Sequence, residues 1–476
     1  MKPSIPQGTR DFSPVEVRKR QFILSTIKTV FELYGFQPLE TPSMENLATL
    51  TGKYGEEGDR LIFKILNNGL HEKKDADKAK LNDEWSKLLE KPYSSSVVTE
   101  RALRYDLTIP FARYVVMHQN ELAFPFRRYQ MQPVWRADRP QKGRYREFWQ
   151  CDCDVVGTNS LINEAELLCI YQQAFDKLTI PEVTIKINSR KILSAIIEYS
   201  GASDKAIEVI TAIDKYDKIG QIGVRDEFIK VGLNNSQIQR LEYLVYFLMK
   251  DSQNIIDVNG RNVRAIDRVE EIFIESNIQI GIVGLNELKQ TLNYYDVIKN
   301  ENWRNKIEID FKLARGLNYY TGIIMEVTTG AVKMGSIGGG GRYDDLTGLF
   351  GLKNLSGVGI SFGVDRIYDV MEELNLFPEA LETGCKVLLI NFGGENELYS
   401  LQILKQLREA NIAAEIYPDA AKFDKQLKYA NKRKIPYVML LGDDERNNKT
   451  VSLKNFTTGD QQTLSVTQSL NILQHE

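Results

Sequence analysis

Histidine and cysteine are scarce in this sequence. The 476 residues include only three histidines and four cysteines. No histidine has the spacing of an HExxH motif or of a Cys/His zinc site, which argues against metallohydrolases and histidine-based catalytic triads. Four cysteines in so long a chain do not make the disulfide framework of a small secreted protein. We therefore expect a cytoplasmic protein, and the sequence allows no metal ligand to be assigned.

Long apolar runs are also missing. The longest one, residues 243–249, covers about two helical turns, whereas a membrane-spanning helix needs about twenty apolar residues. The first twelve residues, MKPSIPQGTRDF, contain no apolar stretch of the kind found in signal peptides. We expect neither a membrane segment nor a secretory leader.

No excess of one charge is present over the whole chain. The sequence has 61 Lys and Arg against 64 Asp and Glu, a net charge of −3. This balance does not indicate nucleic-acid binding, but a local basic patch is sufficient for it. Apolar residues make up 42% and charged residues 26%, as in ordinary globular proteins. The length predicts two to four domains.

Residues 123–157 predict a long hairpin with a basic tip. Seven Lys or Arg residues and only two acidic residues lie between positions 127 and 147. On the second strand, FWQCDCDVV, Gln150, Asp152 and Asp154 alternate with two cysteines and therefore share one face. The hairpin is either a solvated basic ribbon or, as we favour, the floor of a small-molecule pocket. We interpret Cys151 and Cys153 as small buried residues rather than a metal or redox pair.

The remaining periodicity divides the chain into blocks. Residues 15–34 predict an amphipathic helix, residues 37–42 an extended segment, and residues 71–91 a charged, partly helical surface insertion. Apolar stripes predict helices at 190–216, 223–249, 261–276 and 285–300, and alternation predicts strands at 307–312 and 323–327. The strands VLLINF, AAEIYP and YVMLLG alternate with helices at 396–410 and 419–433, which predicts an α/β domain with a largely parallel sheet. The predicted domains are therefore 1–190 and 307–380 as two parts of one domain, 191–306 as a helical insertion, and 381–476.

Three further segments could carry chemistry. The glycines at 338–341 are neither a Walker A sequence nor a GxGxxG motif, so they predict a tight turn or a loop that a ligand approaches, with Arg342 and Arg366 as nearby charges. Residues 315–322, RGLNYYTG, are either packing residues or donors to a ligand. Asp106 lies in an apolar, strand-like piece and needs a partner, for which a ligand ammonium is one candidate.

Six segments together resemble the histidyl-tRNA synthetases, a family of class II aminoacyl-tRNA synthetases. They are PQGTRDF (6–12), LRYDLTIPFARY (103–114), QPVWRADRPQKGRYREFWQCDCDVVG (132–157), LARGLNYYTG (313–322), GGGGRYDDL (338–346) and GVGISFGVDR (357–366). They occur in the order of the family and span nearly the whole chain. The resemblance implies an α+β catalytic domain, built on the class II antiparallel sheet with flanking helices. It also implies a helical insertion and a C-terminal α/β anticodon-binding domain.

The resemblance also implies a reaction and its partners. Histidine is activated by ATP, with Mg²⁺, to histidyl-adenylate, and the histidyl group is then transferred to the 3′ end of tRNA-His. Two-fold homodimers form through motif 1, which matches the helix at 15–34 and the strand that follows it.

The family pattern assigns roles to individual residues. Arg136 and Arg315 are the implied catalytic residues on the two sides of the α-phosphate. Arg366 binds the γ-phosphate, Phe148 stacks on adenine, and Asp138 completes the implied ATP site. Tyr319, Tyr320 and Asp154 contact the imidazole ring, whereas Asp106, Thr108 and Gln150 hold the α-ammonium. The implied histidine site as a whole comprises Asp106, Leu107, Thr108, Arg136, Gln150, Asp154, Arg315, Tyr319 and Tyr320.

For tRNA, the resemblance implies contacts at the hairpin tip and in the C-terminal domain. The implied residues are Arg139, Gln141, Lys142, Arg144, Lys422, Lys425 and Lys428. A merely solvated helix face is the alternative for the three C-terminal lysines. The sequence departs from the pattern where many family members have Glu, since it has Asp106, Asp138 and Asp154, which shortens these carboxylates.

Two other functions remain to be weighed. A catalytically silent paralogue could act as a regulatory subunit of histidine biosynthesis or as a sensor, but such paralogues lack the anticodon domain and parts of the catalytic set. A pure RNA-binding or scaffold protein would not need a polar strand face beside the arginines.

Overall fold

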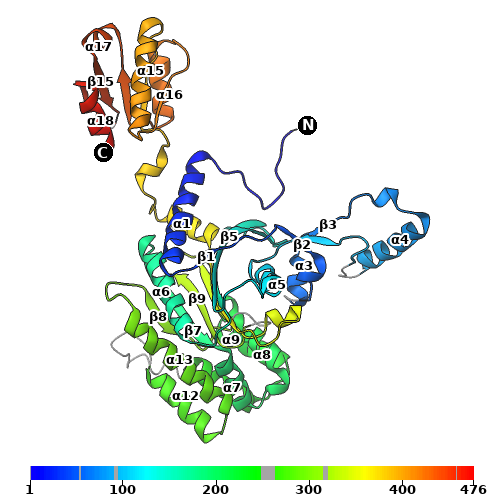
Figure 1. Ribbon diagram of the computed structural model, residues 1–476. Helices are drawn as coiled ribbons and strands as arrows, with labels where there is room; N and C mark the ends of the chain where they lie inside the picture. The colour runs from blue at the N-terminus through cyan, green and yellow to red at the C-terminus, as the bar shows by residue number, and fades with distance from the viewer. Residues whose placement is uncertain are drawn as a thin grey trace. The chain divides into compact units, whose positions relative to one another are not determined.

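The computed structural model describes residues 2–52, 55–90, 95–247, 263–314, 320–456 and 458–475. The chain forms two compact units (Figure 1). Unit 1 comprises Met1–Asp11 and Arg20–Leu376, and unit 2 comprises Phe12–Lys19 and Phe377–Glu476. The domain limits given above stay predictions. Among the described helices, none is both long and apolar enough to cross a membrane.

An eight-stranded sheet forms the centre of unit 1, with the strand order β1-β5-β6-β11-β10-β9-β7-β8. Its neighbours are antiparallel except for the parallel pairs β1–β5 and β7–β8. The strands are β1 (Gln37–Pro38), β5 (Phe126–Trp135), β6 (Glu147–Val156), β7 (Val183–Ser189), β8 (Lys306–Ile309), β9 (Ile323–Thr329), β10 (Gly338–Tyr343) and β11 (Gly357–Gly363). This sheet, with helices packed on it, confirms the predicted α+β fold.

The predicted hairpin is the pair β5–β6. Its antiparallel register runs from Phe126 opposite Val156 to Trp135 opposite Glu147. Cys151 and Cys153 are fully buried, and all four cysteines are free thiols, as expected for small core residues. Because side chains alternate along a strand, Gln150, Asp152 and Asp154 face the other side of the sheet.

Helices α1 (Pro14–Leu33) and α6 (Ile162–Lys177) cover one face of this sheet. The α1 helix has a stripe of buried apolar residues, as its periodicity predicts, and Gly35 follows it with φ +76°. The Phe31 ring packs edge-on against Phe362 of β11, with centroids 5.8 Å apart, and Tyr171 of α6 contacts the same ring at 4.8 Å. Helix α14 (Val364–Glu373) continues directly from β11.

Unit 1 also contains a three-stranded sheet, with the strand order β2-β4-β3. Its elements and their neighbours are β2 (Met44–Asn46), α2 (Leu47–Leu50), α3 (Gly55–Leu61), β3 (Lys64–Ile65), η1 (Leu70–Glu72), α4 (Asp75–Glu90), β4 (Arg101–Leu103), α5 (Thr108–His118) and η5 (Thr347–Phe350). In Figure 1 the α4 helix projects away from the sheet, and only Glu84 of this helix is buried. The predicted charged surface insertion is confirmed for residues 71–90, and residue 91 lies outside the described residues.

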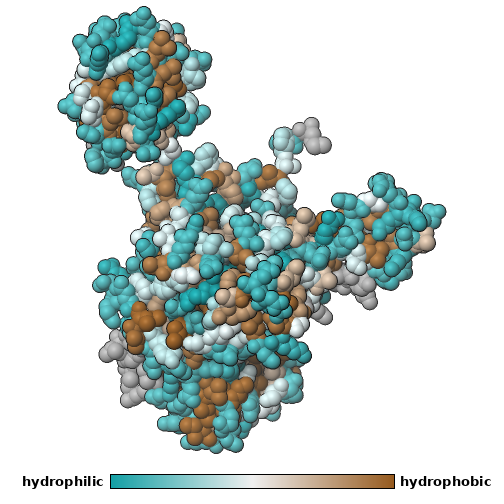
Figure 2. Space-filling view, in the orientation of Figure 1, coloured by the Kyte–Doolittle hydropathy of each residue, from teal (hydrophilic) through white to brown (hydrophobic). Residues whose placement is uncertain are grey.

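The helical block of unit 1 is more broken than its periodicity predicts. The elements are α7 (Arg190–Ser200), η2 (Ser203–Lys205), α8 (Ala206–Asp214), α9 (Tyr216–Lys230), α10 (Asn235–Glu242), η3 (Tyr243–Phe247), α12 (Val263–Glu275) and α13 (Gln279–Ile298). Continuous helices over 190–216 and 223–249 are wrong, because Gly201 (φ +75°) and Gly232 (φ +84°) end a helix in each range. Asn234 then caps α10 by accepting from the backbone N–H of Gln237. Parts of two predicted helices, 248–249 and 261–262, lie outside the described residues. Figure 2 shows apolar residues gathered on the face over α12 and α13.

Unit 2 has its own five-stranded sheet, in the order β13-β12-β14-β15-β16. Its elements are η6 (Glu379–Glu382), β12 (Val387–Leu389), α15 (Gly394–Glu409), β13 (Ala414–Ile416), α16 (Phe423–Lys432), β14 (Tyr437–Leu440), α17 (Asp443–Asn448), β15 (Thr450–Asn455), β16 (Gln461–Ser465) and α18 (Val466–His475). The first three strands are parallel, as predicted, whereas β15 and β16 form an antiparallel extension that the prediction missed. Both hydrophobic clusters of this sheet consist of residues between 385 and 473.

Candidate active site

A cavity of about 470 Å³ lies on the polar face of the β6–β11–β10 region in unit 1. It gathers residues from the hairpin, from the turn before α5, from β10 and from the start of α14. The residues predicted for the site that line it are Asp106, Thr108, Arg136, Asp138, Arg144, Phe148, Gln150, Asp154, Tyr320 and Arg366. Segments separated by more than two hundred residues therefore meet at one hollow.

Other predicted residues lie elsewhere. Leu107 is fully buried and does not line the cavity, and its carbonyl oxygen accepts from Arg128 at 3.4 Å. Arg139, Gln141 and Lys142 are exposed at the hairpin turn and do not line it either. In unit 2, Lys422, Lys425 and Lys428 are exposed at the start and along the surface of α16. Arg315 and Tyr319 lie outside the described residues.

Strand β6 runs along the floor of the cavity and contributes side chains to both of its ends. Phe148 and Asp154 are six residues apart on it, which is about 20 Å along an extended strand. Gln150 and Asp152 lie between them on the same face, and the Gln150 amide donates to Ser361 Oγ of β11 at 2.9 Å. One strand thus carries an aromatic ring, an amide and two carboxyl groups in sequence along the floor of the cavity.

The Asp154 carboxyl group is held from two sides. Tyr343 donates a hydrogen bond to its Oδ1 at 2.6 Å, and Arg128 lies 2.8 Å from its Oδ2. Burial raises the pKa of Asp154, while Arg128 and the Tyr343 hydrogen bond act in the opposite direction. The Arg128 guanidinium is itself fully buried and stacks over Phe111 at 4.1 Å. These contacts fix the position of the Asp154 carboxyl group beneath the cavity.

Asp106 lies in a helix-start turn rather than in a strand-like piece. Strand β4 ends at Leu103, and Asp106 Oδ1 accepts from the backbone N–H of Ile109 at 3.1 Å in the first turn of α5. An aspartate in this position satisfies one of the free N–H groups of a helix start. Burial lowers the pKa of the neighbouring Arg104 to about 10, and this side chain donates to the carbonyl oxygens of Thr41 and Pro133.

Two guanidinium groups mark the opposite end of the cavity. Arg136 Nε donates to the carbonyl oxygen of Tyr105 at 3.1 Å, and its guanidinium lies over the Tyr105 and Phe148 rings at 4.3 and 5.1 Å. Arg366 donates to the carbonyl oxygens of Gly143 and Ser336, at 2.8 and 2.6 Å. Both side chains donate to backbone carbonyl groups, which fixes their direction.

The glycine run forms strand β10, so the predicted turn or loop is wrong. A Cβ atom at Gly340 would collide with the Gly359 carbonyl of β11, and one at Gly341 would lie 2.7 Å from the Ile323 carbonyl of β9. Gly338 and Gly339 line the cavity. Glycine is required here because neighbouring strands approach closely, and the absent side chains leave the cavity open.

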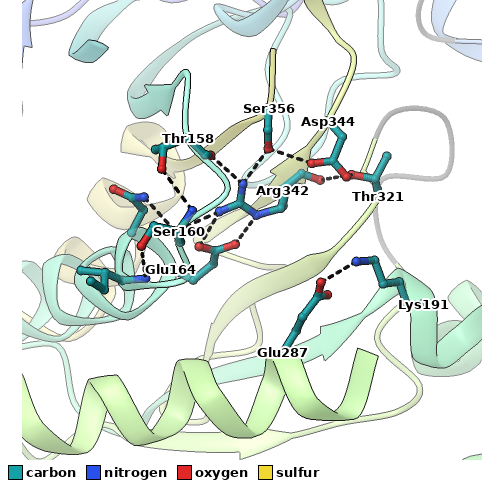
Figure 3. Close-up of polar contacts among 11 residues, drawn as sticks. Thr158, Ser160, Glu164, Lys191, Glu287, Thr321, Arg342, Asp344 and Ser356 are labelled. Atoms are coloured by element: carbon teal, nitrogen blue, oxygen red, sulfur yellow. Dashed lines mark hydrogen bonds and ion pairs between the residues drawn. The ribbon is translucent and has the colours of Figure 1, made fainter. Parts of the chain in front are cut away.

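Arg342, which we expected near a ligand, does not line the cavity. Figure 3 shows its polar contacts instead. Its guanidinium forms a two-pronged ion pair with Glu164 of α6, with distances of 2.5 and 2.8 Å, and it donates to Ser356 Oγ at 2.7 Å. Ser356 and Thr321 donate in turn to the two oxygens of Asp344, at 2.8 and 2.6 Å. This Arg342 network ties α6, β10 and the segment before β9 together.

Sequence reasoning missed a second set of contacts around Asp365. This carboxylate pairs with Arg10 and Arg20, the latter at 2.5 Å, and it accepts from the backbone N–H of Trp149 at 2.8 Å. The Arg10 guanidinium also stacks on the Tyr145 ring at 3.3 Å. Arg10 lies in the segment PQGTRDF that supports the resemblance. The motif therefore marked Arg10 as a residue of interest, but it did not show that Asp365 is its partner.

No metal centre is evident among the described residues. Within these ranges, no three His, Cys, Asp or Glu side chains come together so that they could hold an ion. Three carboxyl groups of the cavity are instead engaged with arginines, with tyrosine or with backbone N–H groups, namely those of Asp154, Asp365 and Asp106.

Comparisons with known proteins agree with this architecture. A family model described as histidyl-tRNA synthetase matches residues 76–367, and a model described as an anticodon binding domain matches residues 386–476. The histidine–tRNA ligase of Christiangramia forsetii is 53% identical over 464 residues, covering 97% of each chain. That of Flavobacterium johnsoniae is 51% identical, covering 97% of this chain and 96% of the relative.

Solved structures give the same result for the fold. The histidyl-tRNA synthetase from Nostoc sp. PCC 7120 superposes with a TM-score of 0.80 at 28% identity, covering 100% of this chain and 99% of the other. A Bacillus halodurans structure titled as an ATP phosphoribosyltransferase regulatory subunit/histidyl-tRNA synthetase is 18% identical, with a TM-score of 0.67, and supports the fold alone. The relatives at about 50% identity do not favour the silent-paralogue alternative. The chain belongs to the histidyl-tRNA synthetase family of class II aminoacyl-tRNA synthetases.

Proposed function

We propose that this aminoacyl-tRNA ligase activates L-histidine with ATP to histidyl-adenylate in the cavity of unit 1, and then transfers the histidyl group to the 3′ end of tRNA-His. AMP and diphosphate are the other products. The observation that carries the proposal is the arrangement of the cavity: two guanidinium groups lie at one end, and a fixed carboxyl group with polar neighbours lies at the other. Such a hollow fits a triphosphate beside a small amino acid that has an α-ammonium and a polar ring.

The arginine end suits phosphate activation. The histidine carboxylate attacks the α-phosphorus, and negative charge develops on the phosphate oxygens as diphosphate leaves. Fixed cations that already point at this position stabilise the transition state without rearranging. Arg136 is proposed to contact the α-phosphate and the histidine carboxylate, and Arg366 the γ-phosphate. For Arg315, the role on the far side of the α-phosphate rests on the family pattern alone.

The adenine would lie at the same end. Phe148 offers an aromatic face beside the Arg136 guanidinium, and Asp138 lines the cavity next to them. ATP is the family's substrate, and we propose that Mg²⁺ arrives bound to its outer phosphates and neutralises part of their charge. No residue of this chain is assigned as its ligand.

The carboxyl end suits an imidazole ring. A neutral imidazole has one N–H donor and one acceptor nitrogen, and Asp154 and Tyr320 are proposed to satisfy both, with Tyr319 beside them by the family pattern. The contacts of Asp154 with Arg128 and Tyr343 support this role because they fix the acceptor. A pocket with fixed polar partners rejects amino acids that leave them unpaired by about 10⁴–10⁵.

The α-ammonium of histidine would lie beside the ring site. Asp106 and Thr108, at the start of α5, and Gln150 of β6 line this part of the cavity. Oxygen acceptors from two different elements can surround a group that has only donors.

Contacts with tRNA are proposed for two exposed basic regions, one in each unit. The hairpin turn presents Arg139, Gln141, Lys142 and Arg144, and α16 presents its three lysines, all exposed. Cations at these positions can neutralise phosphates of the acceptor end and of the anticodon arm.

We further propose a homodimer formed through motif 1 and a cytoplasmic location. Both follow the family pattern. Sedimentation equilibrium of the purified chain measures the assembly directly, and the expected mass is twice 54.5 kDa.

The function is tested by charging. Purified protein is incubated with ATP, labelled histidine and tRNA-His transcript, and histidyl-tRNA is collected by acid precipitation. We expect label in the tRNA and stoichiometric AMP. A protein that binds histidine but never forms histidyl-tRNA or AMP would be the silent paralogue instead.

A further inference from the structure

Asp152 is a buried carboxyl group on the floor of the cavity, and the roles given above do not use it. Its residue is 3% exposed, and it lies between Gln150 and Asp154 on the same face of β6. Its Oδ1 has no hydrogen-bond partner among the residues that the structure describes. A buried carboxyl oxygen without a partner is unfavourable, which indicates that a ligand completes the site.

A second acceptor without a partner lies two residues away. Within the described ranges, Gln150 Oε1 also has no hydrogen-bond partner, and the donation from Gln150 Nε2 to Ser361 fixes the amide in this orientation. The two oxygens belong to one strand face, about 7 Å apart at their Cα atoms. An ammonium group presents three donors and no acceptor, so it matches a site that offers acceptors alone.

The charges around Asp152 favour a cationic partner. The acidic groups that act on it are Asp154 on the same strand and Asp106 from the turn before α5, and Tyr343 of β10 lines the same cavity. The buried cation Arg128 of β5 lies against Asp154, at 2.8 Å. In the described part of the chain, no ion pair involves Asp152 itself, so this corner of the cavity holds more carboxyl groups than cations.

We propose that Asp152 binds the α-ammonium of histidine as its counter-ion, with the Gln150 amide oxygen as a second acceptor. This inference rests on the proposed function, since it assumes that histidine occupies the cavity. It separates the roles of neighbouring carboxyl groups: Asp154, which is held by Arg128 and Tyr343, faces the ring, and Asp152 holds the charged end of the amino acid.

Ammonium binding at Asp152 depends on pH. Burial raises the pKa of Asp152 to about 7, Asp154 and Asp106 add to this rise, and Arg128 and a hydrogen bond with Ser361 oppose it. The carboxyl group is therefore neutral below about pH 7 and charged above it. Ammonium binding requires the charged form, so affinity falls as the pH drops below about 7 and becomes constant above it.

Binding of three ligands separates the contribution of the ammonium from that of the carboxylate. Histidine has a ring, an ammonium and a carboxylate; histamine lacks the carboxylate; and imidazolepropionate lacks the ammonium. Their dissociation constants are measured by isothermal titration calorimetry with the full-length wild-type chain and with Asp152→Asn, which preserves the shape of the side chain. We expect the substitution to weaken histidine and histamine about 10- to 100-fold and to leave imidazolepropionate within about twofold.

Wild-type protein provides a test that needs no variant. Histamine and imidazolepropionate share the same ring, but the ammonium lowers the pKa of the ring and the carboxylate raises it, so each affinity is first corrected for the protonated fraction of the free ligand. From pH 8 to pH 6 we expect histamine affinity to fall about tenfold more than imidazolepropionate affinity, as a carboxyl group with a pKa near 7 loses its charge. Equal pH profiles for these two ligands would overturn the proposal.

The control variant is Cys151→Ser, one residue away on the opposite face of β6, which should leave all three affinities unchanged. If Asp152→Asn weakens all three ligands equally, or none of them, Asp152 does not bind the ammonium. Diphosphate exchange by the wild-type enzyme with histidine separates this failure from failure of the proposed function. Exchange without the ligand-specific effect would refute only the role of Asp152.

Discussion

At the scale of single residues, the site depends on side chains whose direction is fixed before a ligand arrives. Arg136 and Arg366 are held by backbone carbonyl groups, and Asp154 is held by Arg128 and Tyr343. These contacts hold in place the guanidinium and carboxyl groups that the proposed chemistry uses. Preorganised charges of this kind stabilise a transition state without reorganisation during the reaction.

The first prediction concerns Arg136. Replacement by alanine should lower kcat for diphosphate exchange about 100- to 1000-fold, because the developing charge on the α-phosphate loses a fixed cation. Steady-state exchange kinetics measure this effect. Arg268→Ala, an exposed arginine on α12, is the control and should leave kcat unchanged. Comparable kcat values for Arg136→Ala and the wild type would remove Arg136 from the catalytic set.

Residue patterns predicted much of this site but not all of it. Alternation along β6 predicted a polar face, and the structure lines the cavity with Gln150, Asp152 and Asp154. Arg128 and Tyr343 were missed as supports for Asp154, because each lies in a strand whose neighbours are set by tertiary pairing. Tyr343 lies 189 residues from Asp154 along the chain, and local sequence contains no signal for so distant a partner. Arg128 lies directly opposite Asp154 in the β5–β6 hairpin, but the register of that hairpin was not predicted.

At the scale of elements, the Arg342 network joins structures that flank the cavity. Glu164 and Arg342 are 0% and 5% exposed, and burial raises the pKa of Glu164 while Arg342 opposes the rise. The network continues through Ser356 and Asp344 to Thr321, next to Tyr320 of the cavity (Figure 3). A buried pair of this kind is strongly destabilised when only one partner is removed.

The second prediction follows from this burial. Glu164→Ala should lower the free energy of unfolding of unit 1 by about 3–5 kcal/mol, because it leaves the Arg342 charge without its partner. All four tryptophans lie between residues 85 and 303, so tryptophan fluorescence during urea unfolding reports on unit 1.

The neighbouring pair Lys191–Glu287 provides a matched control. Its distance is also 2.5 Å, but its side chains are 26% and 24% exposed. Glu287→Ala should therefore change the free energy of unfolding by less than about 1 kcal/mol. Equal losses from Glu164→Ala and Glu287→Ala would show that burial of the Arg342 pair has no special effect.

Helices and strands were predicted correctly where the pattern is local. The prediction failed at glycines, which form a strand at 338–341 and end helices at Gly201 and Gly232. The hairpin and helix α1 follow directly from alternation and from apolar spacing. The run at 338–341 looked like a turn, yet it forms a central strand because only glycine permits the close approach to Gly359 and Ile323. In the helical block, Gly201 and Gly232 end helices that the apolar stripe predicts as continuous.

At the scale of the whole molecule, unit 1 is proposed to activate histidine and unit 2 to bind tRNA. Unit 1 contains the cavity, and unit 2 has a separate sheet whose hydrophobic clusters use only its own residues. The parallel strands of unit 2 were predicted from their alternation with helices. Strands β15 and β16 were missed because KTVSLKNF and QQTLSV are short and polar.

The third prediction tests this division. Deletion of residues 384–476 should leave histidine-dependent diphosphate exchange near the wild-type rate, because no lining residue of the cavity lies in the deleted segment. Charging of tRNA-His should be strongly impaired, since the lysines of α16 are lost. Parallel exchange and charging assays measure both effects. A truncated protein that charges tRNA normally would contradict the assignment of unit 2 to tRNA binding.

The central claim is that one cavity brings fixed cations beside a pocket that is selective for histidine. The most direct test is ATP–diphosphate exchange by the wild-type chain, measured with each of the twenty amino acids in turn. The account predicts exchange with histidine and about 10⁴-fold less with any other amino acid. Saturating histidine and ATP without exchange, or comparable exchange with a second amino acid, would contradict it.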